Sequence, residues 1–168
     1  MKRWAAAVAA FLAFLPGMAA AQVYQNELSV FGTMDNVNEP IDHELAVLNL
    51  RYGFYFSPRT LATLGLAHAR FDTSVVDTTS TSLTAGVKHY FGEQAPRALL
   101  PFVEAALGLA RVDSGVDEDT DFTMELGAGA AWFITDASSV DVSLRWYHTD
   151  TNDGTEGLRL FLGLTTRF

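Results

Sequence analysis

Six charged side chains stand singly in stretches of the chain that are otherwise small or apolar. They are Arg51, Lys88, Glu104, Glu125, Arg145 and Arg159. Charges that are removed from water must be paired or hydrogen-bonded. If these side chains share one enclosed space, they could fill that space with ion pairs, or they could line a gated ion pore. We favour structural filling, with the pore as the alternative.

A second group of candidate residues is acidic and close together in the sequence. It consists of Asp113, Asp117, Glu118, Asp119 and Asp121. Such carboxylates could bind Ca²⁺ or Mg²⁺, because hard cations prefer oxygen ligands. However, the acidic segment 150–154 does not have the spacing of an EF-hand loop. We therefore favour solvated loops, and we expect no metal and no other cofactor.

The elements that must position these residues are strands, because apolar residues recur with a period of two along most of the chain. We predict strands at residues 26–34, 44–56, 60–71, 80–91, 100–112, 122–133, 139–148 and 157–168. Eight is an even number and the size of the smallest common transmembrane barrel. The fold class that we predict is an all-β, antiparallel, up-and-down transmembrane barrel.

The last predicted strand, 157–168, shows the alternation most clearly. Its four leucines, from Leu158 to Leu164, fall on one face, and Arg159 falls on the other. A Leu-rich strand at the open edge of a sheet would template aggregation. Closure into a barrel removes the edge, and lipid around the barrel explains the leucine face.

The orientation of the two faces decides between two classes of barrel. A soluble, lipocalin-like ligand carrier turns its apolar face inward and a densely charged face to water. Here the polar faces consist mostly of Gly, Ala, Ser and Thr, with few charges. Small residues suit a cramped interior. The pattern therefore favours an apolar exterior with the six charges inside, and the soluble carrier is the alternative.

The heights of the charges along their strands suggest two layers of ion pairs. Lys88 and Glu104 are expected low on neighbouring strands, and Glu125 and Arg145 near mid-height on neighbours. Arg51 could join either layer after strand tilt. The first and third strands alternate less clearly, so the faces of His68 and Arg70 stay open.

Aromatic residues gather toward the ends of the predicted strands, as at membrane interfaces. At the ends with short turns they are Phe54, Phe56, Phe91, Trp132, Phe133 and Phe168; nearer the other ends they are Phe31, Phe71, Phe122, Trp146 and Tyr147. We expect them to form two girdles around the barrel.

The predicted connections alternate in character. Those at 35–43, 72–79, 113–121 and 149–156 are longer and rich in acids, and those at 57–59, 92–98 and 135–138 are shorter. Outer-membrane barrels have long extracellular loops and short periplasmic turns. We therefore expect acidic extracellular loops, with both termini on the periplasmic side.

The first residues indicate export. Lys2 and Arg3 precede an apolar run that is too short to span a membrane, and Ala19-Ala20-Ala21 resembles a cleavage site. We predict a signal peptide at 1–21 and one barrel domain at 22–168. The absence of cysteine excludes disulfides and thiol chemistry. The net charge of −9 argues against nucleic-acid binding.

Three segments carry a resemblance to a known family. They are Gly86-Val-Lys-His-Tyr-Phe-Gly92, the run 100–111, and the closing strand that ends in Arg167-Phe168. With them, the chain resembles the small OmpA/OmpX-type outer-membrane β-barrels of Gram-negative bacteria. The resemblance implies a monomer in the cell outer membrane, surrounded by lipid and lipopolysaccharide. It also implies that Phe168 is a signal for the barrel-assembly machinery.

An enzymatic alternative rests on His148. Lipid A deacylases of the outer membrane share this fold and carry a His, a Ser two residues later and a downstream acid, a set in which His activates the hydroxyl. Here Asp150 occupies the Ser position, and Thr149 and Thr151 do not match it. We therefore expect no enzyme, and a structural or surface-interaction role with a lumen plugged by ion pairs.

Overall fold

The computed structural model describes residues 26–37, 43–73, 77–113, 118–150 and 155–168. Its strands are β1 (Asn26–Val37), β2 (His43–Ser57), β3 (Thr60–Thr73), β4 (Asp77–Tyr90), β5 (Leu99–Asp113), β6 (Glu118–Phe133), β7 (Ser138–Thr149) and β8 (Thr155–Arg167). The predicted signal peptide, 1–21, lies outside the described residues. In the part that is described, no helix is both long and apolar enough to cross a membrane.

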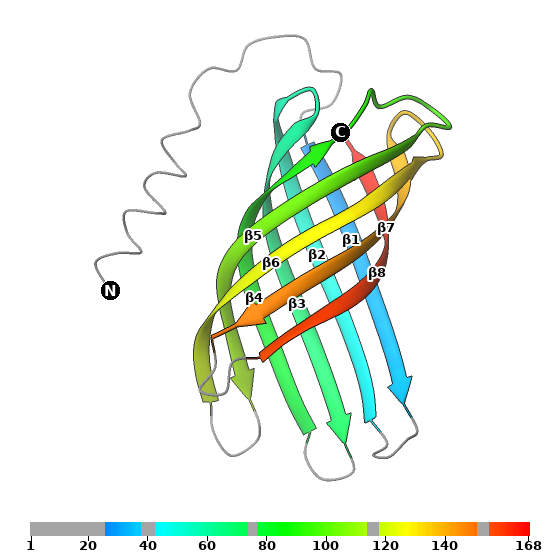
Figure 1. The fold of residues 1–168 in the computed structure, drawn as a ribbon. Coiled ribbons are helices and arrows are strands. Elements are labelled where there is room, and N and C mark those ends of the chain that lie inside the picture. The colour runs from blue at the N-terminus through cyan, green and yellow to red at the C-terminus, as the bar shows by residue number, and fades with distance from the viewer. Residues whose placement is uncertain (1–25, 38–42, 74–76, 114–117, 151–154) are drawn as a thin grey trace, which may run out of the picture.

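The eight strands form a closed antiparallel barrel in which each strand pairs with its neighbours in sequence (Figure 1). Strands β1 and β8 close it with a register from Glu27↔Arg167 to Gly32↔Leu162. At the end of this seam, the backbones of Asn26 and Phe168 exchange two hydrogen bonds, of 2.9 and 3.1 Å. The predicted fold class is confirmed.

Asn26 at the start of β1 and Phe168 after the end of β8 lie at the same end of the barrel as three connections (Figure 1). These connections are residues 58–59, 91–98 and 134–137. We call this the turn end. At the opposite end, the strands extend into the acidic segments that were expected to be loops. Strand β4 already begins at Asp77, and β6 at Glu118. The backbone ladders there continue to Asp72↔Asp77 between β3 and β4 and to Asp113↔Glu118 between β5 and β6.

Apolar side chains cover the outside of the barrel. Leu158, Leu160, Leu162 and Leu164 of β8 are all more than 60% exposed, and the burial of β5 alternates strictly from Leu99 to Ala106. This confirms the predicted orientation, and the soluble carrier with an apolar lumen is wrong. His68 and Arg70 also belong to the exposed, outward-facing set of β3.

Small residues inside the barrel leave room for large ones on facing strands. Gly163 of β8 lies against the ring of Phe31 on β1, and a Cβ there would come within 2.7 Å of Phe31 Cε1. Gly129 of β6 similarly faces Phe102 of β5, whose Cζ would be 2.7 Å from an added Cβ. The interior is therefore filled by interdigitated side chains.

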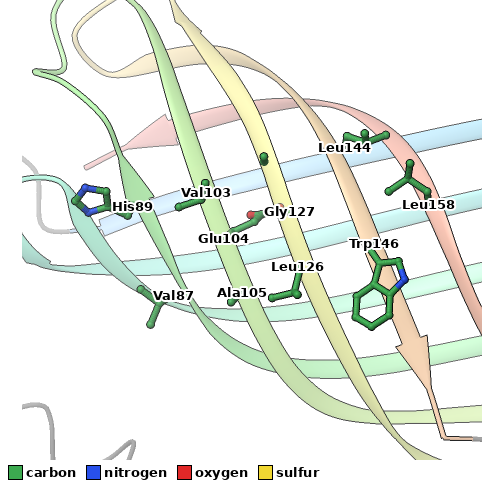
Figure 2. A pocket seen from close by; sticks show the side chains of 11 residues that line it. Val87, His89, Val103, Glu104, Ala105, Leu126, Gly127, Leu144, Trp146 and Leu158 are labelled. Atoms are coloured by element: carbon green, nitrogen blue, oxygen red, sulfur yellow. The ribbon is translucent and has the colours of Figure 1, made fainter.

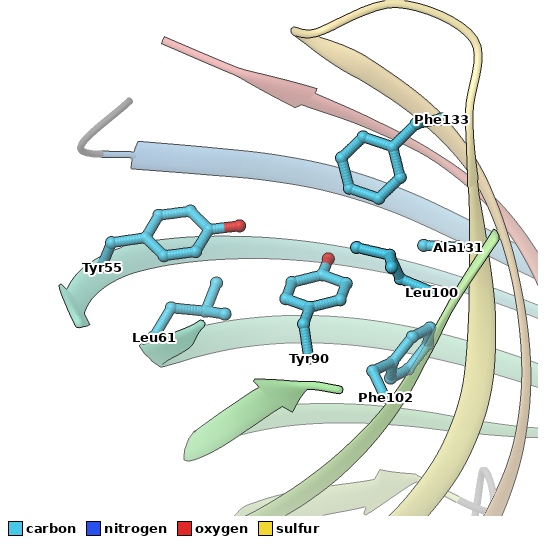
Figure 3. Close-up of a cluster of buried hydrophobic side chains, with 7 residues drawn as sticks. All are labelled: Tyr55, Leu61, Tyr90, Leu100, Phe102, Ala131 and Phe133. Carbon is cyan, nitrogen blue, oxygen red and sulfur yellow. The ribbon is translucent and has the colours of Figure 1, made fainter. Parts of the chain in front are cut away.

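A hydrophobic cluster occupies the lumen near the turn end. Figure 3 shows its side chains converging from strands β2 to β6. They are Tyr55, Leu61, Tyr90, Leu100, Phe102, Ala131 and Phe133. Phe133 had been expected in an outer girdle, but it is fully buried because it continues the inward parity of Glu125 and Ala131. Phe31 is likewise inside, at 1% exposure, and Tyr147, also expected in a girdle, lines a cavity in the lumen.

Candidate functional site

Four charged residues form a compact group in the lumen next to the hydrophobic cluster. We call Glu27, Lys88, Asp141 and Arg167 the Glu27 cluster. Lys88 Nζ lies 3.0 Å from Glu27 Oε1 and 3.1 Å from Asp141 Oδ2. Arg167 Nε lies 3.2 Å from Glu27 Oε2. Each residue is at most 2% exposed, and the two cations balance the two carboxylates.

Hydroxyl groups complete the hydrogen bonding of both carboxylates. Tyr55 donates to Glu27 Oε2 at 2.7 Å, and Tyr90 to the same oxygen at 3.0 Å. Ser139 and Thr165 donate to Asp141 at 2.6 and 3.0 Å. Buried ion pairs persist only when their remaining lone pairs are satisfied in this way.

Aromatic rings also contact the two cations of the Glu27 cluster. Lys88 Nζ lies 4.3 Å from the centre of the Phe102 ring and 4.6 Å from that of Tyr90. The guanidinium carbon of Arg167 lies 4.0 Å from the centre of the Phe133 ring. Such contacts are attractive because the face of an aromatic ring is electronegative. The cluster thus fills the lumen with charges that are paired, hydrogen-bonded and packed.

A second group of charges lies further from the turn end. We call Arg51, Glu104, Glu125 and Arg145 the Arg51 cluster. Arg51 Nη1 lies 2.5 Å from Glu104 Oε2, and its Nη2 lies 2.9 Å from Glu125 Oε2. Arg145 Nε lies 2.5 Å from Glu104 Oε1. Arg51 and Glu104 belong to β2 and β5, so this pair crosses the lumen rather than following a ladder.

The six charges singled out in the sequence all line the interior, but they are distributed unevenly. Arg51 contacts Glu104 and Glu125, and Arg145 contacts Glu104, whereas Lys88 contacts Glu27 and Asp141. Lys88 and Glu104 are opposite each other in register, as expected, yet each forms ion pairs with other residues. Arg159 stacks on Tyr147, with its guanidinium carbon 3.9 Å from the ring centre.

Three charged residues of the Glu27 cluster were missing from the sequence-based set. Asp141 and Arg167 lie on the inward parity of their strands, so the alternation itself could have identified them. Glu27 was harder to find, because Phe31 on the same face of β1 obscures the polar pattern of Glu27 and Ser29.

The residues of the enzymatic alternative are not assembled into a triad. His148 stacks on Trp146, with ring centres 6.0 Å apart, and its Nδ1 is 4.0 Å from Glu156 Oε2. The hydroxyl of Thr149 donates to Thr123 Oγ1 at 3.3 Å instead. Thr151 lies outside the described residues.

The acidic segments are only partly described. Asp117 and the side chain of Glu118 lie outside the part of the chain that the structure describes. Within the described residues, no group of three or more acidic, histidine or cysteine side chains could hold a metal ion.

An apolar groove of about 610 Å³ runs across the outer face of β4 to β8. Figure 2 shows His89 near one end of this groove, and Trp146 and Leu158 near the other. Its floor contains the small residues Ala105 and Ala128. In water such a surface would be a liability, but in a bilayer it contacts acyl chains.

A closed eight-stranded barrel with a leucine exterior and a lumen of paired charges defines a transmembrane β-barrel. The chain belongs to the outer membrane protein beta-barrel domain family, whose sequence profile matches residues 7–168. It is therefore a protein of the cell outer membrane. No curated protein sequence matches the chain significantly.

Solved structures with this fold come from several bacteria. The N-terminal β-barrel domain of Pseudomonas aeruginosa OprF is 21% identical, with a TM-score of 0.60 over 86% of this chain and 98% of that one. Yersinia pestis Ail in a phospholipid nanodisc is 18% identical, with a TM-score of 0.59 over 86% and 99%. The outer membrane enzyme PagL is 17% identical, with a TM-score of 0.54 over 82% and 97%. Because one of the three is an enzyme, the fold alone does not decide the activity.

Proposed function

We propose that this protein is a structural or surface-interaction barrel whose lumen is plugged by its two ion-pair clusters. The observation that carries the proposal is the Glu27 cluster, in which four charges balance and all four residues are at most 2% exposed. An ion that entered would have to break hydrogen bonds that are already made to Glu27 and Asp141. The hydrophobic cluster next to these charges adds a second obstacle at the turn end.

Conductance measurements on the refolded full chain in planar bilayers test the plug. We expect no stepwise current for the wild type or for Glu125→Ala, because the Glu27 cluster stays intact in both. Arg59→Gln is a matched control, since Arg59 is exposed at the turn end and lies 3.7 Å from Glu93. Regular wild-type steps that change in Glu125→Ala but not in Arg59→Gln would favour the pore and reject the plug.

The proposal gives the protein no enzymatic role. His148 is engaged with Trp146, and Asp150 stands where the deacylase pattern has a serine. Mass spectrometry of lipid A from cells that overproduce the protein should show no change from cells that carry an empty vector. Loss of one acyl chain that depends on His148 would overturn this part.

The surface role is supported by the strand ends opposite the turn end, which are rich in acids. Ail, which shares the fold, has been solved with the heparin analogue sucrose octasulfate. For this acidic chain we propose a cationic partner surface instead, because like charges repel a polyanion. Surface plasmon resonance should show salt-sensitive binding of polylysine and no binding of sucrose octasulfate; the reverse would contradict it.

The remaining features concern the membrane. We propose a monomer whose apolar exterior is covered by lipid and lipopolysaccharide. We also propose that Phe168, which is exposed on the outer face, is read by the barrel-assembly machinery. Assembly of Phe168→Ala in cells, monitored by heat-dependent gel mobility, should be slower than that of the conservative Phe168→Tyr. Equal assembly of the two variants and the wild type would remove this role.

A further inference from the structure

A cavity of about 410 Å³ lies in the lumen on the side of the Arg51 cluster away from the turn end. Glu125, Arg145 and Phe161 lie deep in it, and hydroxyl groups of Ser80, Ser82 and other residues line its walls. This volume is within the range of sites for small molecules. Neither the plug nor the lipid-facing exterior accounts for it.

The arginine at the base of the cavity has hydrogen-bond donors that the described protein groups do not use. Arg145 is 2% exposed, and its Nη1 and Nη2 find no acceptor among the described residues. The rings of Phe31 and Phe161 lie 4.3 and 4.5 Å from its guanidinium carbon, and they fix the group without accepting a conventional hydrogen bond. Buried donors without acceptors are costly, so a partner from outside the protein would stabilise this arrangement.

A buried acceptor in the same cavity also has no partner. Asn49 is 2% exposed, and its Oδ1 finds no donor among the described residues. A ligand that satisfies both residues carries an acceptor for the Arg145 N–H groups, for which an anionic oxygen is strongest, and an O–H or N–H donor for Asn49 Oδ1. The hydroxyls of Ser80, Ser82 and Thr123 can bind either kind of group.

The charges around the cavity favour an anion at its base. Of the residues that line the cavity, Arg145 and Arg159 carry positive charges and Glu125 a negative one. Arg51 and Glu104 of the adjacent Arg51 cluster form an ion pair with each other. Both carboxylates already accept hydrogen bonds from Arg51. Asp121, which lies on the same inward parity of β6 nearer the strand end, opposes ligands with several negative charges.

We propose that this cavity binds a small hydroxylated monoanion of the size of one sugar acid. Its carboxylate contacts Arg145 and Arg159, and a hydroxyl group donates to Asn49 Oδ1. The cavity and the Glu27 cluster lie on opposite sides of the Arg51 cluster, so a ligand bound there leaves the plug at the turn end undisturbed. Binding is therefore independent of conduction through the barrel.

Titration of the refolded full chain with glucuronate, followed by backbone-amide NMR in detergent micelles, tests this site. We expect saturable shifts at residues 49, 123, 145 and 159. Neutral glucose, which keeps the hydroxyls but lacks the carboxylate, should bind at least about tenfold more weakly. The same titration with inorganic phosphate distinguishes general oxyanion binding from recognition of a sugar acid. We expect phosphate to bind more weakly than glucuronate, and equal affinity would reject recognition of the sugar acid.

Variants locate the binding. Arg159→Gln should weaken glucuronate binding about tenfold, because it removes one charge-assisted contact and leaves the ion pairs of the Arg51 and Glu27 clusters intact. Arg59→Gln, at the turn end, should bind as the wild type does. Heat-dependent gel mobility verifies that each variant is folded. The proposal fails if glucuronate gives no saturable shift, if glucose binds equally well, or if Arg159→Gln and the wild type have the same affinity.

Discussion

Glu27 and Arg167 face each other across the seam that closes the barrel, and their side chains form an ion pair of 3.2 Å inside it. Glu27 also accepts hydrogen bonds from Lys88, Tyr55 and Tyr90. One carboxylate thus joins four strands, β1, β2, β4 and β8, at the point where the two ends of the sheet meet.

Replacement of Glu27 should destabilise the barrel strongly. Glu27→Gln removes the carboxylate that pairs with Arg167 and leaves Lys88 paired only with Asp141 among the residues of the cluster. Removing one partner from a buried ion pair lowers the free energy of unfolding by about 3–5 kcal/mol. Urea unfolding of the barrel in lipid vesicles would measure the loss. Glu93→Gln is the matched control, since the side chain of Glu93 is 90% exposed and should contribute little. Equal stability of the two variants would show that the Glu27 cluster is not a structural support.

The two glutamates of the Arg51 cluster should differ. Glu104 forms ion pairs with both Arg51 and Arg145, and its side chain is 5% exposed. Among the described residues, Glu125 forms an ion pair with Arg51 alone, and its side chain is 16% exposed. We expect Glu104→Gln to cost about 3–5 kcal/mol and Glu125→Gln about 1.5 kcal/mol, as for one hydrogen bond to a charged group. The same unfolding measurement compares them, and a larger effect at Glu125 would contradict the geometry.

Gly163 should not tolerate a methyl group. Gly163→Ala would force the Phe31 ring from its place, and overpacking of this kind costs about 1–3 kcal/mol. Gly32→Ala is the control, because the nearest atom to its added Cβ is 3.7 Å away. Phe31→Leu in the Gly163→Ala background should recover part of the lost stability. A Gly163→Ala barrel as stable as the Gly32→Ala one would be inconsistent with this packing.

The leucine face should reject charge in a bilayer. Leu160 lies midway along β8 and is 62% exposed, so Leu160→Arg should lower stability in lipid vesicles by about 2–4 kcal/mol. Thr166→Arg, near the turn end of the same face, should cost only about 0–1 kcal/mol. If the two substitutions had equal effects, the depth of Leu160 in the membrane would be in question.

The sequence was sufficient for the barrel and its two faces, because a period of two specifies which side chains share a face. The parity of the leucines in β8 predicts their exposure, and the same alternation places Arg51 and Arg145 inside. The ion pair between Arg51 and Glu104 could not be predicted, since these residues are on strands that are not neighbours. Their contact depends on strand tilt and on the width of the lumen, neither of which is local in sequence.

The errors at Phe31 and Phe133 have a related cause. Aromatic residues near strand ends suggest an interfacial girdle, but parity decides the face, and it places both rings in the lumen. There they pack against Arg145 and Arg167, respectively. An aromatic residue on the inward, polar face of such a strand is therefore better interpreted as a partner for a buried cation than as part of an interfacial girdle.

The seam between β1 and β8 has a kinetic consequence. Its ion pair joins residues 140 positions apart, so it forms only after the intervening hairpins have brought the two ends together. We expect Glu27→Gln to speed unfolding while leaving the folding rate nearly unchanged, because contacts that form after the transition state affect the unfolding rate. The lifetime of the assembled protein in the membrane would then depend on the last contact that its chain makes.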